Sequence, residues 1–493
     1  MKNIAIPKIS ILLLLSFLLT TSCDDFLTTV PESAYSTEGF YESESDFEYA
    51  IAGVYSAQQE LFNGTTFFRF TIGRSDDTNV METNTYMYGG DTFTDGDDCS
   101  ALETAWSDLW IVISRCNAIL DKIDGVDFDD TAMKNYIKGE AYALRAWTYY
   151  TLSISFGGMP LIDTELSVEE TKKVARSTQE ETFAFVEDDY KKAIDLLPAS
   201  WTGDNLGRIT KYAAEGGLAR LYMFQSDFSS AKTYLKNIID SGLYGMEEEY
   251  KNCFTESNEN GKERVWEVQF CGGESGEGQN FSGASVQEGY SGDLTPFSGA
   301  SAAMHASTNL LAEYEDGDLR KDITVATGLN INGILEEYYY FIKFMYYSTV
   351  PQSTEDWGIN LPVLRYTDVL MMYAECLNED SYVAGGEAFS IINKVRERAG
   401  LGALTSATVP DQDSFRKAMI HERRIEFAYE SLRWPDLVRW GIAKDVMTTF
   451  LQDNDEGAGI YSMDGDYRKI YAIPGDEMSR YSDETVMWQN PGY

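Results

Sequence analysis

The chain has 493 residues, of which 80 are acidic and 39 basic, so its formal net charge is −41 at neutral pH. A hydrophobic fraction of 43% allows an ordinary buried core. The acidic excess disfavours nucleic acid and anionic membrane surfaces as partners, because proteins bind both through clustered Lys and Arg.

The chain opens with a secretory signal. Residues 4–19 are almost wholly apolar, and small residues at 20–22 lead into Cys23 and an acidic pair. This pattern defines a cleaved signal rather than a membrane span, which needs about 20 apolar residues. The position of Cys23 resembles the lipobox of bacterial lipoproteins, in which residues 1–22 would be removed and the cysteine acylated. Thr20 stands where Leu is usual, and an ordinary signal with a chance cysteine is the alternative.

Amphipathic helices are predicted in a first block, residues 46–245. Apolar residues recur there at spacings of three and four, the period of a helix with one buried face. A weak repeat pairs Glu140 and Arg145 with Glu215 and Arg220 and resembles degenerate tetratricopeptide-like helix pairs. An ordinary helical bundle, which has the same periodicity, is the alternative. The predicted helices run through residues 47–55, 102–119, 133–154 and 183–197.

An irregular, glycine-rich segment of about 246–360 follows, with predicted strands at 265–270 and 337–344. Long loops inside a compact protein are usually functional or disordered, and the many aromatic residues here argue against plain disorder. A second helical block with a tail, residues 365–493, contains predicted helices near 370–377, 388–399 and 415–428.

Five cysteines remain after Cys23, an odd number that leaves at least one unpaired within the chain. The sequence leaves open whether Cys99 bonds Cys116 and whether Cys253 bonds Cys271. Cys116 and Cys376 fall inside helical patterns, where a buried thiol acts as a small hydrophobic residue.

Segments at both ends of the chain resemble the SusD/RagB family of outer-membrane nutrient-binding lipoproteins. They occur in the family's order and together span essentially the whole mature chain. Thr367 and Ser431 depart from the commoner Ala and Gly. The segments are 23–27 (CDDFL), 50–55 (AIAGVY), 365–375 (RYTDVLMMYAE), 392–401 (INKVRERAGL), 422–430 (ERRIEFAYE), 433–440 (RWPDLVRW) and 489–493 (QNPGY).

The resemblance implies one mainly α SusD-like domain, residues 23–493, with degenerate tetratricopeptide-like helix pairs and a loop-rich ligand-binding region containing a few short strands. It also implies a lipid-anchored protein, exposed on the outer membrane, that delivers oligosaccharides to a SusC-like TonB-dependent transporter. Some branches bind peptides instead. The family has no enzymatic activity and no cofactor. A surface hydrolase, the third alternative, would need paired carboxylates beside an aromatic cleft, and none stands out.

Sugars stack their apolar C–H faces on aromatic rings, so a sugar site should contain exposed rings with polar neighbours. The resemblance places such rings in the loop before residue 106 and in the irregular segment. For each ring, a place in the core or in an interface is the alternative. The candidates are Tyr86, Tyr88, Phe93, Tyr290, Phe297 and Trp357.

Charged residues of the last block are predicted to be structural, because Arg and Glu on a buried helix face form pairs that lock neighbouring helices. The acidic stretch 91–98 resembles a calcium loop, but its third position is Phe, so we expect a solvated acidic loop, with calcium as the weaker alternative. No other metal site is predicted. The structural candidates are Arg423, Arg424, Glu426, Arg433 and Trp434, and the calcium candidates are Asp91, Asp95 and Asp97.

Overall fold

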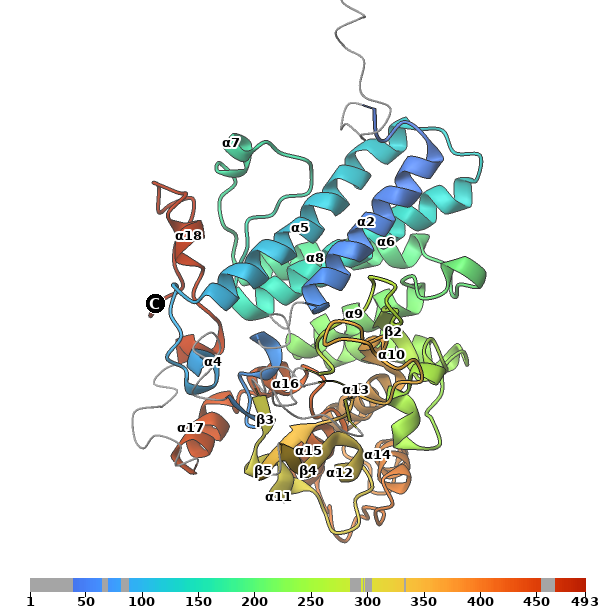
Figure 1. The fold of residues 1–493 in the computed structure, drawn as a ribbon, viewed down its shortest axis with the longest axis vertical. Coiled ribbons are helices and arrows are strands. Elements are labelled where there is room, and N and C mark those ends of the chain that lie inside the picture. The colour runs from blue at the N-terminus through green and yellow to red at the C-terminus, as the bar shows by residue number, and fades with distance from the viewer. Residues whose placement is uncertain are drawn as a thin grey trace, which may run out of the picture.

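The structure, a computed structural model, describes residues 39–63, 70–80, 88–283, 294–295, 297, 304–331, 334–453 and 466–493. Helices dominate this part of the chain, and short strands lie among them (Figure 1). The predicted mainly α fold is therefore confirmed. No helix in the described ranges is long and apolar enough to cross a membrane. Cys23 and the predicted signal lie outside those ranges.

The first helical part contains every helix predicted for it. Each long helix packs against the next one in the chain, so the part builds up as a continuous stack (Figure 1). The helices are α2 (Glu44–Asn63), α5 (Ser100–Lys122), α6 (Thr131–Phe156), α8 (Gln179–Leu196), α9 (Lys211–Phe224) and α10 (Phe228–Asp240).

Local sequence sets where these helices begin and end. The Asp130 carboxylate caps α6 by accepting hydrogen bonds from two backbone N–H groups of the first turn. Thr178 and Glu181 form a capping box at the start of α8. Gly157 ends α6 with a φ of 85°, a backbone conformation that glycine adopts without steric cost.

The two members of the weak repeat have matching roles. Arg145 on α6 binds Asp189 on α8, and Arg220 on α9 binds Asp368 on a later helix. Close packing accompanies these pairs, since a Cβ added at Gly217 on α9 would lie 2.4 Å from the Tyr190 hydroxyl of α8. Both features favour stacked helix pairs as the building unit.

The second helical part joins the first directly. Helix α10 packs against α13, although the irregular segment separates them in sequence. One hydrophobic cluster consequently extends through both parts. The helices are α13 (Tyr366–Asp380), α14 (Glu387–Arg398), α15 (Gln412–Glu426), α16 (Arg433–Arg439) and α17 (Ala443–Asp453).

The described strands form three antiparallel pairs. β1 (Thr78–Val80) pairs with β3 (Met304–Ala306), and β2 (Arg264–Val268) pairs with β6 (Leu361–Arg365). β4 (Val325–Ile331) pairs with β5 (Ile334–Phe341). Both predicted strands are thus present, as β2 and as β5, which begins and ends three residues earlier than expected.

Short helices connect these elements. The α-helical ones are α4 (Tyr88–Thr92), α7 (Val168–Thr171), α11 (Thr308–Glu313), α12 (Lys321–Thr324) and α18 (Gly475–Met478). The 3-10 turns are η2 (Ile123–Gly125), η3 (Gly203–Asn205), η4 (Tyr250–Phe254), η5 (Glu256–Asn258) and η6 (Asp466–Lys469).

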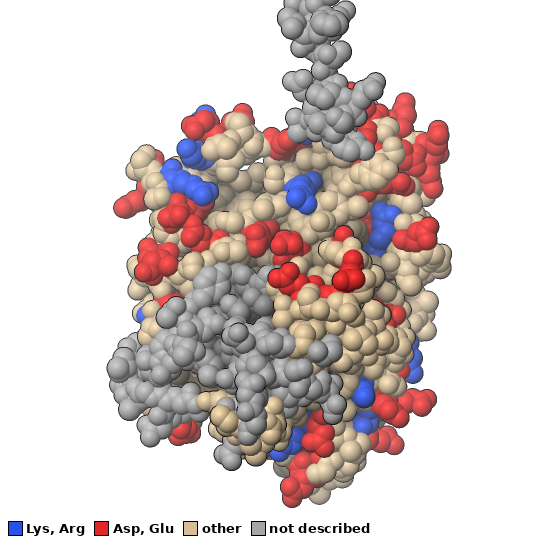
Figure 2. All heavy atoms as spheres, in the orientation of Figure 1, with Lys and Arg blue, Asp and Glu red and all other residues tan. Residues whose placement is uncertain are grey.

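All five cysteines in the described part of the chain are free thiols, so neither disulfide left open by the sequence forms. Cys116 and Cys376 are buried, as predicted. Burial raises the pKa of the Cys116 thiol to about 12, which keeps it protonated and unreactive at neutral pH. On the face shown in Figure 2, acidic side chains are widespread and basic ones fewer, in keeping with the net charge.

Candidate functional site

The segments that carry the predicted ligand-binding rings converge at one strand pair. In the β1–β3 register, Val80 lies opposite Met304. Because the strands are antiparallel, the end of β1 lies beside the start of β3. The segment that contains Tyr86 follows β1, and the segment that contains Tyr290 precedes β3, so the two segments begin and end next to each other. Helix α4, which begins at Tyr88, packs against β1. Tyr86 and Tyr290 lie outside the described residues, and only the backbone of Tyr88 is described.

Trp357 lies in the core, which was the alternative to a ligand-binding position for this ring. Its side chain is fully buried in a small apolar cluster, where the half-buried Phe297 meets its ring edge-on at a centroid distance of 6.1 Å. Its backbone exchanges hydrogen bonds with Gln279. In this arrangement Trp357 presents no ring face to solvent and instead fixes the segment around it.

Phe93 is also a core residue in this structure. Only 2% of it is exposed, and its ring lies 5.7 Å from that of Trp434. The Arg74 guanidinium sits 4.8 Å from the Phe93 ring centroid, a cation–π contact. The two rings place the end of α4 firmly against α16.

The weak calcium candidates do not form a cation site in this geometry. Both carboxylate oxygens of Asp95 accept hydrogen bonds from Arg74, at 2.7 and 2.9 Å, so the guanidinium takes the position that a cation would need. Asp91 is buried and Asp97 is exposed, and the three carboxylates do not gather into a potential metal site.

Within the described ranges, one group of acidic and imidazole side chains is close enough to hold a metal: Glu315, His421 and Glu422. Arg396 already occupies it, because its Nη1 donates to Glu315 at 2.6 Å and to Glu422 at 3.0 Å. This cluster is therefore an ion-pair network of the helical core.

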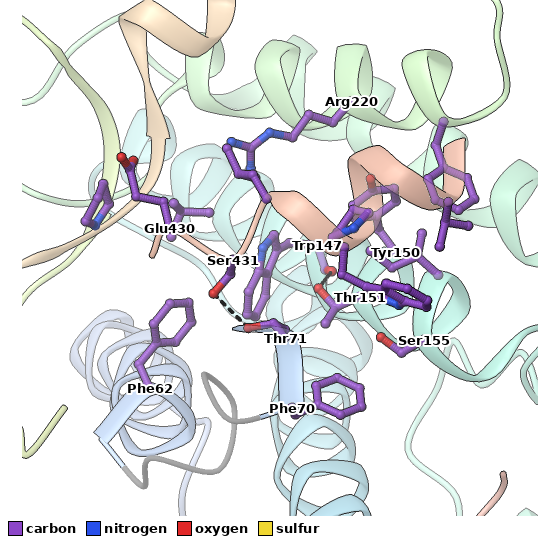
Figure 3. Close-up of a pocket in the computed structure, with 18 of the residues that line it drawn as sticks. Phe62, Phe70, Thr71, Trp147, Tyr150, Thr151, Ser155, Arg220, Glu430 and Ser431 are labelled. Atoms are coloured by element: carbon purple, nitrogen blue, oxygen red, sulfur yellow. Dashed lines mark hydrogen bonds between the residues drawn. The ribbon is translucent and has the colours of Figure 1, made fainter. Parts of the chain in front are cut away.

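A cavity lies where α2, α6, α9, β6 and α16 meet (Figure 3). Its walls are mainly aromatic and aliphatic, and Thr71 donates a 2.7 Å hydrogen bond to Ser431 across it. Its volume of about 100 Å³ is well below the roughly 300–1,000 Å³ of small-molecule sites. The cavity is a packing gap between the two helical parts, with Trp434 in its wall.

The structure adds an aromatic pair that sequence reasoning did not single out. Tyr338 on β5 is 40% exposed and stacks on His305 of β3 at a centroid distance of 4.4 Å. His305 is directly paired with Asn79 of β1, so Tyr338 lies beside the strand pair where the ring-bearing segments converge. Burial lowers the pKa of His305 to about 4 and keeps it neutral at pH 7. Tyr338 and Tyr340 are two positions apart and so lie on the same face of β5, where both contact His305, and this spacing was the available signal.

The predicted structural residues of α15 and α16 support this strand pair. Arg424 donates a hydrogen bond to the Asp77 carboxylate at 2.8 Å, and Arg433 donates to both carboxylate oxygens of Asp76, each at 2.8 Å. Asp76 and Asp77 immediately precede β1. Ion pairs from the C-terminal helices thereby fix the turn from which β1 starts.

Glu426 and Arg423 hold the helices themselves together. Glu426 is fully buried and accepts hydrogen bonds from Arg398, Arg365 and Arg320 at 2.6, 3.0 and 3.3 Å. Burial alone would raise the pKa of Glu426, but the three guanidinium groups outweigh it and lower the pKa to about 2. Arg423 donates to Asp368 on α13 and to Asp436 on α16. These positions agree with the structural role predicted for these residues.

Comparison with known proteins matches both ends of the chain to two related family models. Residues 323–493 match the SusD family, and residues 25–223 match a family described as "Starch-binding associating with outer membrane". The chain belongs to the SusD/RagB family. SusD-like protein P2 of Formosa agariphila is 28% identical over an alignment that covers 99% of each chain, and a SusD-like protein of Bacteroides ovatus is 25% identical over 88% of this chain and 82% of that one.

Solved structures of surface glycan-binding proteins and of SusD-like proteins share the fold. Surface glycan-binding protein A from Bacteroides fluxus superposes with a TM-score of 0.78 at 22% identity, covering 92% of this chain and 100% of that one. A laminarin-binding SusD-like protein gives 0.74 at 24% identity over 92% and 100%. Surface glycan-binding protein A from Bacteroides thetaiotaomicron, solved with laminarihexaose, gives 0.74 at 19% identity over 91% and 99%.

Proposed function

We propose that this SusD-like protein is a cell-surface lipoprotein that captures oligosaccharides and delivers them to a SusC-like TonB-dependent transporter in the outer membrane. Full-length similarity to SusD-like proteins, some of whose solved structures are described as glycan-binding, is the observation that carries this proposal. Acylated Cys23 would hold the protein at the membrane. It would bind its ligand without changing it chemically and would need no cofactor.

The geometry gives a physical basis for capture. Ion pairs of α15 and α16 fix the turn before β1. The β1–β3 pair then holds the end of the segment after β1 next to the end of the segment before β3, and these are the two segments that carry the predicted rings. Rings on those segments could then cover the C–H faces of a sugar while the helical scaffold stays fixed. Tyr86, Tyr88, Tyr290 and the exposed Tyr338 are the rings that we assign to this face, with Phe297 at its edge.

A screen for the ligand tests the proposal. The chain without residues 1–22 would be applied to a glycan array, with laminarihexaose as the first soluble ligand because two SusD-like structures name laminarin or that oligosaccharide. We expect binding of at least one oligosaccharide class, with micromolar or tighter affinity by calorimetry. Binding of peptides but no glycan would favour the peptide-capturing alternative, and turnover of a bound glycan would contradict a pure binding role.

A further inference from the structure

A groove, separate from the cavity between the two helical parts, runs along the loop that contains residues 203–208, between α2 and β2. Two adjoining hollows, of about 480 and 310 Å³, share Leu206, Gly207, Arg208 and Glu267. Both volumes fall within the roughly 300–1,000 Å³ of small-molecule sites. None of the described candidates Phe93, Phe297 and Trp357 lines either hollow, and we call the pair the α2–β2 groove.

The loop between the two hollows is held in one conformation. Gly207 has a φ of 96°, and a Cβ there would come within 2.6 Å of the Gln269 side chain, so glycine allows the loop to lie against β2's continuation. Arg208 fixes the loop to α6 by donating to both carboxylate oxygens of Glu140, at 2.6 and 2.5 Å. It also donates to Asn205 at 2.7 Å. The groove is therefore preformed.

The larger hollow contains a buried hydrogen-bond donor with no acceptor. Gln58 of α2 is only 1% exposed, and its Nε2 has no partner in the described part of the protein. A buried donor left unpaired costs about 1–3 kcal/mol, and because this nitrogen is itself enclosed, a ligand oxygen would meet it only after the Gln58 side chain turns toward the hollow. The amide side chains of Gln59 and Gln269 line the same hollow.

The other groups of the groove select the class of ligand. Glu48, Asp204, Glu267 and Glu277 line the larger hollow, where the paired Arg208 is the only cation among the described lining residues, so anionic ligands are repelled. The smaller hollow adds Lys262 and Arg264, whose charges face Glu247 and Glu267. It also adds the half-buried rings of Trp201 and Tyr244, each of which already contacts a neighbour, Arg208 and Tyr366 respectively. Amides next to rings with a second face for C–H groups suit a neutral sugar.

We propose that the α2–β2 groove is an additional binding site for a neutral oligosaccharide, separate from the ring-bearing segments at β1 and β3. This inference rests on the proposed function. An extra site would raise avidity for a long glycan without tightening either site by itself.

Occlusion of the groove tests this inference. Ala52 and Ser56 are exposed on α2 and line the larger hollow, so Ala52→Trp and Ser56→Trp should fill it without disturbing the core. Glu60→Trp is the matched control, because Glu60 is exposed on the same helix and lines neither hollow. Calorimetry with short and long forms of the array-identified glycan would be combined with hydrogen–deuterium exchange of the wild-type chain and circular dichroism of each variant.

We expect the long glycan to protect peptides that cover residues 200–208 and 264–270, and both occluding variants to weaken its binding at least fivefold while Glu60→Trp leaves binding unchanged. If wild-type protein binds the glycan but these peptides stay unprotected and the folded occluding variants bind as tightly as wild type, the groove is not a glycan site and the proposed function stands. If wild-type protein binds no glycan, both proposals fail together.

Discussion

Arg423 on α15 donates a 2.7 Å hydrogen bond to Asp368 on α13, and both side chains are buried. Asp368 also accepts from Arg220 on α9, at 2.7 Å, so one carboxylate ties the first helical part to the second. Burying these charges costs free energy that only their mutual pairing offsets. The junction is therefore sensitive to the loss of any one partner.

Arg424→Ala should lower the free energy of unfolding by about 3–5 kcal/mol, because it leaves the buried Asp77 carboxylate without its hydrogen-bonded guanidinium. Arg423→Ala should lower it by less, because Asp368 keeps Arg220 and Asp436 keeps Arg439. Urea unfolding followed by circular dichroism measures this. Arg480→Ala is the control, since the Arg480 side chain is 61% exposed and its pair with Glu477 should contribute less than about 1 kcal/mol. A variant at 423 or 424 that keeps wild-type stability but loses ligand binding would show that the structural assignment is wrong.

Acid should weaken the same junction. Burial alone would raise the pKa of Asp368, but Arg423 and Arg220 outweigh it and lower the pKa to about 2, from an ordinary value of 3.8. Because the folded-state pKa is the lower one, the stability from this group is complete above about pH 5 and is lost as the pH falls toward 2. At 1.36 kcal/mol per pKa unit, the loss is about 2 kcal/mol.

Urea unfolding of wild type and Asp368→Asn between pH 6 and pH 2 measures that loss. The variant should be less stable at pH 6, and its stability should fall less steeply with acid, so that the two curves approach each other. Parallel curves would mean that the Asp368 pKa is not depressed in the folded protein.

The helical scaffold was predictable because its signals are local. Apolar spacing located α5 and α6, and Gly157 marked the end of α6. The ion-pair partners were not predictable, since Arg424 and Asp77 are 347 positions apart and only the fold brings them together. The same reason explains why Trp357 and Phe93 were predicted as ligand-binding rings but are buried. The sequence of a loop does not show which side chains are buried, and these two are buried by segments distant in sequence.

The proposed lipid anchor gives a prediction that does not depend on the fold. Cys23→Ala should abolish acylation, because the acyl chains have no other attachment point at the mature N-terminus. The variant should move from the detergent phase to the aqueous phase in detergent partitioning, and antibody labelling of intact cells should fall to background. Cys271→Ala, which removes an exposed free thiol elsewhere, is the control. Unchanged partitioning of the Cys23 variant would contradict the lipoprotein assignment.

The predicted ligand face can be separated from the core by comparing rings of each kind. Tyr86→Ala and Tyr88→Ala together should weaken glycan binding at least tenfold, because each stacking contact is worth on the order of 1 kcal/mol. Trp357→Ala should instead reduce the free energy of unfolding by about 3–5 kcal/mol, the usual cost of removing a buried aromatic ring. Calorimetry with the array-identified glycan and urea unfolding would be carried out on all three variants. If the double tyrosine variant folds normally and binds the glycan as tightly as wild type, the ligand face does not lie on the segment that follows β1.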